Sequence, residues 1–529
     1  MSFNSLSDAQ KERLSLQQDS IINSSSTKVY VSAGPGSGKT HTISEKIRLD
    51  IDGSFDYQGV IACSFTKEAA RELENRVERL TSTKTSIIKT LDSFVLTEVI
   101  NPFLNRYLYL KDEDKHKQIL KLEISFPKGN ERIKEVNNLT RLYDGEKSWK
   151  DIPTVKNYVM NWYSKFKKGK YEISFPSYII ASDYLSRLDI LTDYFESRFT
   201  SIYIDEAQDL NAFQHLFLRT LVEKCKLNIV MIGDGNQSIY AFRGAKPQIF
   251  RGLPDLGYDV YNIDISVRCH DSILALAYLL FDNKRKIQVS ENRIYIGGFL
   301  TSDFLRTLKE NYMILVESKA KAKELYYDYV SKGLDITYSE SINYDSEALI
   351  VYKDEYMEFI EESILFYYNS DNEDFEMIYS HDDYIDFIEN SGFNTKKIKN
   401  SLYKEKNENV IEFLSRLSKI LDFEFSGKLL EELRKELSNP IIYSHYYRKK
   451  KVNRIMTFHS SKGLESENVI TVFQYNQYNI GYEYLRKCFV GFTRAKNNLY
   501  INFVDQAIGS KNEKYIKQLY QNVLASVQK

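Results

Sequence analysis

The segment AGPGSGKT at residues 33–40 restricts the possible folds most, because it directly follows the apolar run KVYVSA at residues 28–33. The run predicts a short buried strand, and THTISEKIRL at residues 40–49 predicts the helix that follows. Closely spaced glycines between a strand and a helix expose backbone N–H groups that can surround phosphates. A plain glycine turn would need neither Lys39 nor Thr40, so we predict a nucleotide-binding loop, in which Ala33 replaces the usual first glycine. Its expected nucleotide contacts are Ala33, Gly34, Pro35, Gly36, Ser37, Gly38, Lys39 and Thr40, and Thr40 would also bind Mg²⁺.

Strands and helices alternate further along the chain. GVIACS at residues 59–64 predicts a strand, and residues 66–80 predict a helix with Thr66 as its N-cap. Residues 201–204 and 228–232 predict two more strands. This alternation predicts an α/β fold with a parallel sheet, in which functional sites gather at the carboxyl ends of the strands.

An acidic pair follows one of these strands, in IYIDEAQD at residues 202–209. Asp-Glu pairs often lie in solvated loops, but this one comes after an apolar strand in a chain that already has a phosphate loop. Such a pair suits Mg²⁺ coordination by one carboxylate and orientation of an attacking water by the other. We expect Asp205 to bind the metal and Glu206 to act as the base.

A second α/β unit is expected to open near residue 260, and the chain, at 529 residues, is long enough for several domains. Between the two units, residues 95–195 lack buried-strand patterns and predict a mainly helical insertion. Residues 351–440 interrupt the second unit and include the acidic stretch 371–390, which we interpret as a solvated face. The strands predicted for the second unit are residues 260–265, 312–316, 454–457, 469–473 and 498–502.

Composition excludes several classes of protein. Lys and Arg total 72 and Asp and Glu total 73, so any nucleic-acid site must be a local groove. The polar N-terminus and the absence of a long apolar run argue against secretion and membrane spanning, so we expect a cytoplasmic protein. The four cysteines lie too far apart for a zinc ribbon or a disulfide framework: Cys63, Cys225, Cys269 and Cys488.

VMIGDGNQSIYAFRGA at residues 230–245 closely resembles the third motif of the UvrD, Rep and PcrA helicases of superfamily 1. Other motifs of this family occur in the expected order along nearly the whole chain. They are Gln18, SFTKEAAREL (64–73), TLDSF (90–94), SVRCH (266–270), MTFHSSKGLESENVI (456–470) and CFVGFTRAKNNLY (488–500).

The resemblance implies an NTP hydrolase of the DNA helicase type, using ATP and Mg²⁺ and moving 3′ to 5′ on single-stranded DNA. It also implies two RecA-like parallel-sheet domains, 1A and 2A, each with a mainly helical insertion. The expected ranges are 1–94 and 196–262 for domain 1A, 95–195 for insertion 1B, 263–350 and 441–529 for domain 2A, and 351–440 for a reduced insertion 2B.

Catalytic roles carry over from the matching motifs. Gln237 would sense the γ-phosphate, and Arg268 and Arg494 would be arginine fingers from the second domain. Gln18 and Glu465 would contact the nucleotide. The implied catalytic set is Lys39, Asp205, Glu206, Gln237, Arg268 and Arg494.

The residues implied to touch single-stranded DNA are mostly aromatic, and aromatic rings can stack on any base. Core packing is the alternative for Phe65 and Phe242, and a structural role is the alternative for His459. The full set is Phe65, Thr66, Tyr240, Phe242, Arg243 and His459.

Some positions depart from the family pattern. Val267 stands where a base-stacking Tyr is usual, which predicts a relaxed nucleotide preference. Asp92 replaces the usual His of its motif, and Lys67-Glu68 replaces the usual Asn-Lys, so we expect modest DNA affinity. WYSKFKKGKY (162–171) and HYYRKKK (445–451) could each compensate as a DNA contact or be an ordinary solvated face.

The segment after Arg494 is short and leaves no room for a nuclease domain. Together with the small 2B insertion and the strings IIKTLDSFVLTEVINPF (87–103) and SVRCHDSI (266–273), it resembles the helicase subunits of Gabija anti-phage defence systems. That resemblance implies an OLD-family TOPRIM nuclease as partner and DNA ends or single strands as ligand. Two alternatives stay open: a nucleotide- and DNA-regulated sensor that controls a nuclease without productive unwinding, and a stand-alone DNA-repair helicase.

Overall fold

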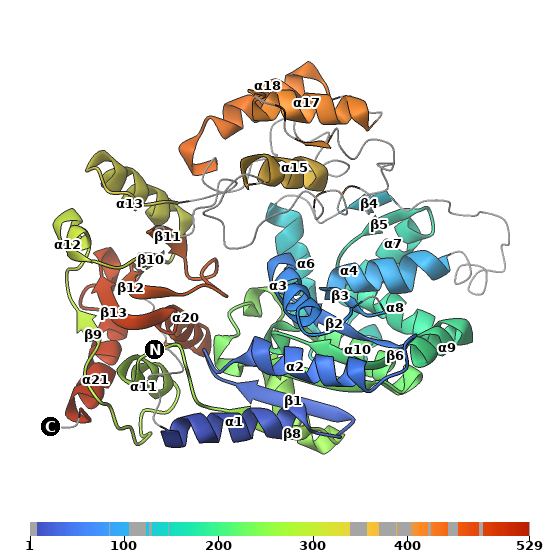
Figure 1. Ribbon diagram of the computed structural model, residues 1–529, viewed down its shortest axis with the longest axis horizontal. Helices are drawn as coiled ribbons and strands as arrows, with labels where there is room; N and C mark the ends of the chain where they lie inside the picture. The colour runs from blue at the N-terminus through green and yellow to red at the C-terminus, as the bar shows by residue number, and fades with distance from the viewer. Residues whose placement is uncertain are drawn as a thin grey trace.

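The computed structural model places two parallel sheets beside each other, with helices on their faces (Figure 1). One sheet belongs to the N-terminal half of the chain, and the other to the C-terminal half. The structure describes residues 8–527 except 84, 105–122, 126–129, 146–147, 339–356, 370–383, 385–387, 389–401, 404, 406, 422–424, 443–452 and 476–479.

The first sheet has six strands in the order β3-β2-β6-β7-β1-β8, and every neighbouring pair is parallel. The carboxyl ends of all six strands therefore lie at one edge, where the loops after β1, β2, β6 and β7 meet. The strands are β1 (Lys28–Ala33), β2 (Gly59–Ser64), β3 (Ile87–Thr90), β6 (Phe199–Ile204), β7 (Asn228–Gly233) and β8 (Asp259–Ile263).

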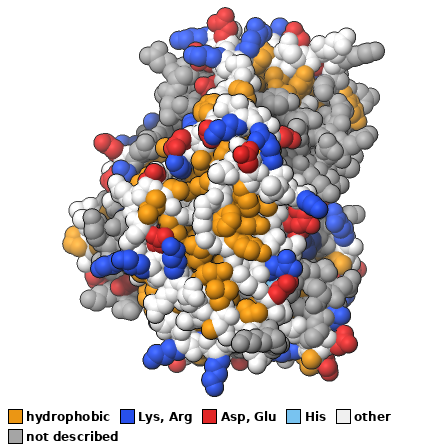
Figure 2. All heavy atoms as spheres, turned by 90° about the vertical axis from the view of Figure 1, so that its left-hand side faces the viewer, with side chains coloured by type: hydrophobic (Ala, Val, Ile, Leu, Met, Phe, Trp, Pro, Cys, Tyr) orange, Lys and Arg blue, Asp and Glu red, His pale blue; other side chains and the backbone are white. Residues whose placement is uncertain are grey.

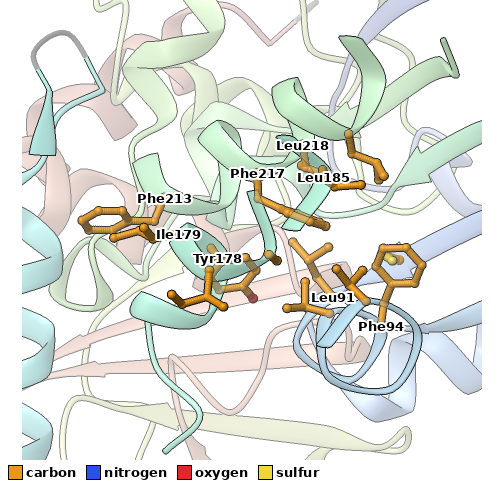
Figure 3. Packing of buried hydrophobic residues seen from close by; sticks show 14 of the residues in the cluster. Leu91, Phe94, Tyr178, Ile179, Leu185, Phe213, Phe217 and Leu218 are labelled. Carbon is orange, nitrogen blue, oxygen red and sulfur yellow. The ribbon is translucent and has the colours of Figure 1, made fainter. Parts of the chain in front are cut away.

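Helices cover both faces of this sheet, and successive side chains of each strand point to opposite faces, so each strand contributes to two cores. In β1, Val29 and Val31 pack under α1 (Asp8–Ile22), α2 (Lys39–Asp52) and α3 (Lys67–Glu78). Tyr30, between them, joins the core on the other face. That core is covered by α8 (Pro176–Arg187), α9 (Asp189–Arg198) and α10 (Ala212–Cys225). Figure 3 shows Tyr178, Ile179 and Leu185 of α8 packed with Phe213, Phe217 and Leu218 of α10 beside Leu91 and Phe94.

The insertion into the first half is mainly helical in its described part, as the resemblance implied. Its two short strands, β4 (Glu123–Ser125) and β5 (Lys170–Glu172), form a parallel pair that the sequence did not reveal, because three residues are too few to show a pattern. The insertion follows α4 (Leu91–Phe94) directly. Its described helical segments, besides α8 and α9, are a π-helical turn (Val95–Ile100), α6 (Asn130–Leu142), a 3-10 turn (Trp149–Asp151) and α7 (Pro153–Phe166).

The second sheet has five parallel strands in the order β11-β10-β12-β13-β9. The strands are β9 (Ile294–Ile296), β10 (Tyr312–Val316), β11 (Arg454–Thr457), β12 (Ser466–Phe473) and β13 (Ala495–Phe503). The helices around them are α11 (Asp271–Leu279), α12 (Ser302–Thr307), α13 (Lys319–Ser331), α20 (Tyr482–Phe492) and α21 (Lys511–Ala525). The sheet thus has helices against both faces, one core being formed with α11, α20 and α21 and the other with α12 and α13.

The expectation that residues 260–265 begin the second unit is wrong. Strand β8 pairs with β1 and closes the edge of the first sheet. It is an edge strand whose first four residues stay partly or fully exposed, so its sequence carries little of the continuous apolar pattern of a central strand. The second sheet instead begins with β9, a three-residue strand that the sequence did not reveal.

The interruption of the second unit is helical where it is described, with α15 (Met357–Asn369), α17 (Val410–Ile420) and α18 (Gly427–Leu437) around their own core. It touches the first half through an ion pair of 3.3 Å between Arg71 on α3 and Glu362 on α15. Apart from Tyr384 and Ile388, which are buried in that core, the acidic stretch 371–390 lies outside the described residues.

The face that carries α12, α13 and α21 mixes apolar, basic and acidic side chains (Figure 2). Tyr327 and Val330 on α13 and Leu524 on α21 are exposed there. This view shows no field of one sign, as expected from the balanced charge of the chain. Among the described helices, none is long and apolar enough to cross a membrane.

Candidate functional site

The predicted phosphate loop lies between β1 and α2, at the carboxyl edge of the first sheet. Gly36 (φ 66°) and Gly38 (φ 81°) adopt the left-handed conformation that favours glycine. A Cβ atom at Gly36 would lie 2.3 Å from the Cβ of Arg268, so the second half of the chain approaches the loop closely. The loop is therefore both a turn and a contact surface between the two halves.

Lys39 folds back over this loop, and its Nζ donates hydrogen bonds to the carbonyl oxygens of Ala33 (3.3 Å) and Gly34 (3.2 Å). Burial lowers the pKa of Lys39, while Glu206 and Asp234 oppose the shift. Gln18 from α1 donates to the carbonyl of Ser37 at 3.2 Å. The predicted nucleotide ligands Gln18 and Lys39 thus meet at the same loop.

The acidic pair follows β6 at the same edge. Asp205 donates its backbone N–H to the carbonyl of Cys63 (2.9 Å), and its Oδ1 accepts the N–H of Glu206 (2.8 Å). Burial raises the pKa of Asp205, and the neighbouring Glu206 charge raises it further. Glu206 has a left-handed φ of 52°, which a residue with a Cβ adopts only at a cost, and such strain is typical of functional sites.

The surroundings of Asp205 fit a magnesium ion. The hydroxyl of Thr40 and the second carboxylate oxygen of Asp205 have no hydrogen-bond partner among the described residues. One carboxylate, one hydroxyl, phosphate oxygens and water form the oxygen set that Mg²⁺ prefers. Within the described ranges, no group of three or more His, Cys, Asp or Glu side chains could hold a metal alone. The site therefore suits a metal that arrives with its nucleotide.

Arg494 reaches the acidic edge from the second half of the chain. Its side chain is buried, and its three nitrogens donate to the carbonyls of Val490 (3.0 Å) and Leu464 (3.2 Å) and to Oε1 of Gln237 (3.1 Å). Gln237 in turn donates to Asp234 at 2.9 Å. Burial, with Arg268 nearby, lowers the pKa of Arg494 to about 10, so the guanidinium remains charged at pH 7.

Arg268, the other predicted finger, lies over the phosphate loop and pairs with Glu465 at 2.5 Å. Glu465 also forms an ion pair with Lys496, whose Nζ lies 2.7 Å from Oε1 of Glu465. Although burial opposes ionisation, Arg268 and Lys496 lower the pKa of Glu465. Val267, just before Arg268, holds the loop through a backbone hydrogen bond to Gly36 of 2.8 Å.

Lys462 is a site residue that the sequence reasoning missed. Its Nζ lies 3.4 Å from Oε2 of Glu206 and forms a close ion pair with Asp209. Although burial opposes its charge, Asp209 and Glu206 raise the pKa of Lys462. The signal was available, because Lys462 stands in the same motif as His459 and Glu465.

Beside this cleft, four rings form a continuous group, here called the aromatic strip: Phe65, Tyr240, Phe242 and His459. Phe65 stacks on Tyr240 with ring centroids 5.0 Å apart, and Phe242 packs edge-on against His459 at 5.5 Å. Tyr240 lies 5.9 Å from Phe242 and 6.3 Å from His459. The strip joins loops after β2 and β7 of the first sheet to the loop after β11 of the second.

The remaining predicted DNA residues border this strip. The guanidinium of exposed Arg243 lies 5.3 Å from the Tyr240 ring centre, and Phe242 is 37% exposed. Thr66 is exposed and caps α3 by accepting the N–H of Ala69, as its predicted capping role requires. Burial, with Lys487 nearby, lowers the pKa of His459, so this ring is mainly neutral at pH 7.

The positions that depart from the family pattern, and the two basic segments that could compensate for them, lie in different environments. The carboxylate of Asp92 accepts a hydrogen bond from the hydroxyl of the buried Tyr178 on α8, and burial raises the pKa of Asp92. In WYSKFKKGKY, Trp162, Phe166 and Tyr171 are core residues, which favours the interpretation of that segment as an ordinary surface. HYYRKKK (445–451) and the side chains of Lys67 and Glu68 lie outside the described residues.

Comparison with known proteins agrees with this geometry. Residues 14–255, which include the phosphate loop, the acidic pair and most of the aromatic strip, match the UvrD/REP helicase N-terminal domain. The chain is similar to the UvrD-like helicases over this region. It is therefore an ATP-hydrolysing enzyme of the DNA helicase class, with two α/β sheets as the resemblance implied.

Among the relatives of this helicase is the Gabija protein GajB of Bacillus cereus (strain VD045), 25% identical over 520 residues that cover 94% of this chain and 98% of the relative. A "Probable DNA helicase II homolog" of Mycoplasma genitalium is 27% identical over 64% of this chain and 51% of its own length. The ATP-dependent DNA helicase PcrA of Staphylococcus aureus is 24% identical over 44% of this chain and 35% of its own length. The alignments thus cover nearly all of GajB and only part of the longer helicases.

Proposed function

We propose that this chain uses ATP hydrolysis to move 3′ to 5′ on single-stranded DNA, as the motor or DNA-sensing subunit of an antiviral complex. One observation carries the proposal: Arg494 from the second half contacts Gln237 of the first, directly beside the acidic pair. A nucleotide bound at the phosphate loop would therefore be contacted by both halves of the chain. Closing and opening of that cleft would change the spacing of the loops that form the aromatic strip.

The proposed hydrolytic roles follow from chemistry at each position. Lys39 would neutralise phosphate charge, Glu206 would orient the attacking water, and Gln237 would contact the γ-phosphate. Arg268 and Arg494 stabilise charge that develops in the transition state, which buried, preorganised cations do well in a low-dielectric cleft. Gln18 and Glu465 hold the nucleotide from either side.

Thr40 and Asp205 would hold Mg²⁺, which when bound supplies positive charge to the phosphate oxygens. Asp205 donates its backbone N–H to Cys63 and accepts the N–H of Glu206 at its Oδ1, and these two bonds orient the carboxylate for this task.

The proposed DNA contacts are the aromatic strip with Thr66 and Arg243. Stacking on aromatic rings is worth about 1–3 kcal/mol per base and tolerates any base sequence. Arg243 is exposed beside Tyr240, where it can approach a phosphate of the strand. A neutral His459 contributes a ring and a hydrogen bond rather than a charge.

The antiviral assignment rests on the relative that matches this chain over almost its entire length. That relative is a Gabija protein, and 98% of it is aligned. We infer that this chain acts with an OLD-family TOPRIM nuclease that receives information about DNA ends or single strands.

A sensor that hydrolyses ATP without productive unwinding is the second candidate. The acidic residue Asp92, which replaces the usual His of its motif next to the predicted DNA path, favours weak backbone contacts and so a sensing role.

A strand-displacement assay run beside an ATPase assay separates the candidates. The substrates are partial duplexes with a 3′ or a 5′ single-stranded tail. The motor predicts ATP-dependent displacement from the 3′-tailed substrate alone. Hydrolysis without displacement from either substrate would favour the sensor, and displacement from the 5′-tailed substrate alone would contradict the proposed direction.

A further inference from the structure

Lys462 connects the proposed hydrolytic site to the proposed DNA site. It lies between β11 and β12 of the second sheet, yet its ammonium reaches Glu206 and Asp209 of the first half. The same ammonium lies 5.4 Å from the centre of the Tyr240 ring. One buried lysine thus touches the expected catalytic base and the central ring of the aromatic strip.

Two carboxylates, those of Asp209 and Glu206, compete for the Lys462 ammonium. Asp209 is fully buried and forms the closer ion pair, and Glu206 lies 3.4 Å away. Gln208 also donates a hydrogen bond to Oε2 of Glu206, the oxygen that faces Lys462. In this arrangement the Glu206 carboxylate is occupied by a lysine and an amide and is poorly placed to orient water.

We propose that Lys462 is a positioning residue that restrains Glu206 until single-stranded DNA engages the aromatic strip. This inference rests on the proposed function and specifies how DNA regulates hydrolysis. A base that stacks on Phe65 and Tyr240, or a phosphate beside Arg243, shifts the ring against which Lys462 lies. The ammonium then moves towards Asp209, and Glu206 becomes free to orient the attacking water.

Asp209 keeps the free-energy cost of this movement low, because a buried ammonium that leaves one carboxylate must stay paired with another. The Asp209 side chain is completely buried and already paired with Lys462. Burial raises the pKa of Asp209 to about 6, although the Lys462 ammonium opposes this shift. The pair Glu206 and Asp209 therefore gives Lys462 two positions, one restraining and one permissive.

The test compares steady-state ATP hydrolysis with and without an oligothymidylate in the full chain. In Lys462→Met, kcat without DNA should rise about tenfold. This gain is smaller than the whole contribution of a general base, which is about 10²- to 10⁴-fold. KM for ATP should stay within about twofold, and DNA should then stimulate little further. In Asp209→Asn, Lys462 keeps only Glu206, so kcat without DNA should fall and the ratio of stimulation should increase.

Two further variants keep this test decisive. Lys462→Met/Asp209→Asn removes both charges of the closer ion pair, so Asp209 is not left as an unpaired buried charge, and the kcat of this variant without DNA should also exceed that of the wild type. Lys321→Met is the matched control, because Lys321 is an ion-paired lysine of the second half with 11% side-chain exposure against 10% for Lys462. It should leave both rates unchanged.

The outcomes are distinguishable. A wild-type chain that DNA does not stimulate overturns the proposed function and this inference with it. A stimulated wild type whose folded double variant shows no gain in kcat without DNA overturns the inference alone. An equal loss of both rates in Lys462→Met, repeated in the double variant, would show that Lys462 is required for hydrolysis and would also overturn it.

Discussion

The nucleotide cleft and the aromatic strip lie next to each other across the same boundary, but they are built from opposite chemistry. The cleft holds charged groups that are buried and paired, such as Arg494 with Gln237 and Lys462 with Asp209. The strip holds half-buried rings, of which Phe242 is 37% exposed. Both draw on the same two segments, residues 233–243 after β7 and 457–465 after β11. The difference teaches that short loops can serve two ligands when each loop turns its charged residues one way and its rings the other.

Removing the Lys39 ammonium from the phosphate loop should have the largest effect on ATP hydrolysis. Lys39→Ala should reduce kcat for ATP by about 10³-fold or more, because no other described residue places an ammonium on the phosphate loop. Measured by phosphate release, turnover near that of the wild type would remove Lys39 from the account. Thermal unfolding of the variant should remain cooperative, which separates lost chemistry from lost folding.

Arg494→Lys should come next, with kcat lower by about 10³-fold, at the low end of the about 10³- to 10⁵-fold that an arginine finger contributes. A lysine cannot donate to Gln237, Val490 and Leu464 together, because it lacks the planar fork of arginine. Arg486→Lys on the preceding helix α20 is the matched control and should hydrolyse ATP normally. Equal losses in the two variants would mean that Arg494 acts through packing alone.

A substitution in the aromatic strip should weaken DNA binding and leave the chemical step of ATP hydrolysis unchanged. Tyr240→Ala should weaken single-stranded DNA binding by about 5- to 150-fold, which corresponds to about 1–3 kcal/mol of lost stacking. Phe55→Ala is the control, because Phe55 is 67% exposed and also stacks on a tyrosine, Tyr57, at 5.7 Å. Fluorescence anisotropy with a labelled oligonucleotide would distinguish them, and unchanged affinity in Tyr240→Ala would exclude the strip as the DNA site.

Val267 is an apolar position of the cleft, and adding an aromatic ring there should sharpen the contrast with the strip. Val267→Tyr should lower KM for ATP by about 2- to 10-fold, because an aromatic contact adds about 0.5–1.5 kcal/mol. The backbone hydrogen bond from residue 267 to Gly36 is kept in this variant. Comparison of ATP with GTP should show increased preference for ATP, and an unchanged ratio would mean that the base lies elsewhere.

Sequence patterns predicted the centre of each sheet well, because β1, β2, β7, β10 and β12 are apolar runs in a chain that buries both faces of its sheets. They failed at the other edges, although the edge strand β11 was predicted with its observed bounds. Strand β8 was assigned to the wrong sheet, and the short strands β3 and β9 were not expected, since edge strands need little apolar sequence and pairing partners are not encoded locally.

The candidate site shows the same limit. Motif spacing brought out Lys39, Asp205 and Arg494 because each has a distinct chemical task at a predictable end of a strand. Lys462 was missed, although it stands three residues from Glu465, because its importance comes from reaching across to Asp209 and Glu206. Contacts between distant halves of a chain depend on how the domains meet, which no local pattern states.

The most direct test of the account is the rate of ATP hydrolysis by the wild-type chain with increasing single-stranded DNA. The account predicts a rate that rises several-fold and saturates with DNA, and a Lys39→Ala chain that stays inactive at every DNA concentration. A wild-type rate that does not change with DNA, in a chain that demonstrably binds it, would contradict the claim that the cleft and the strip work as one device.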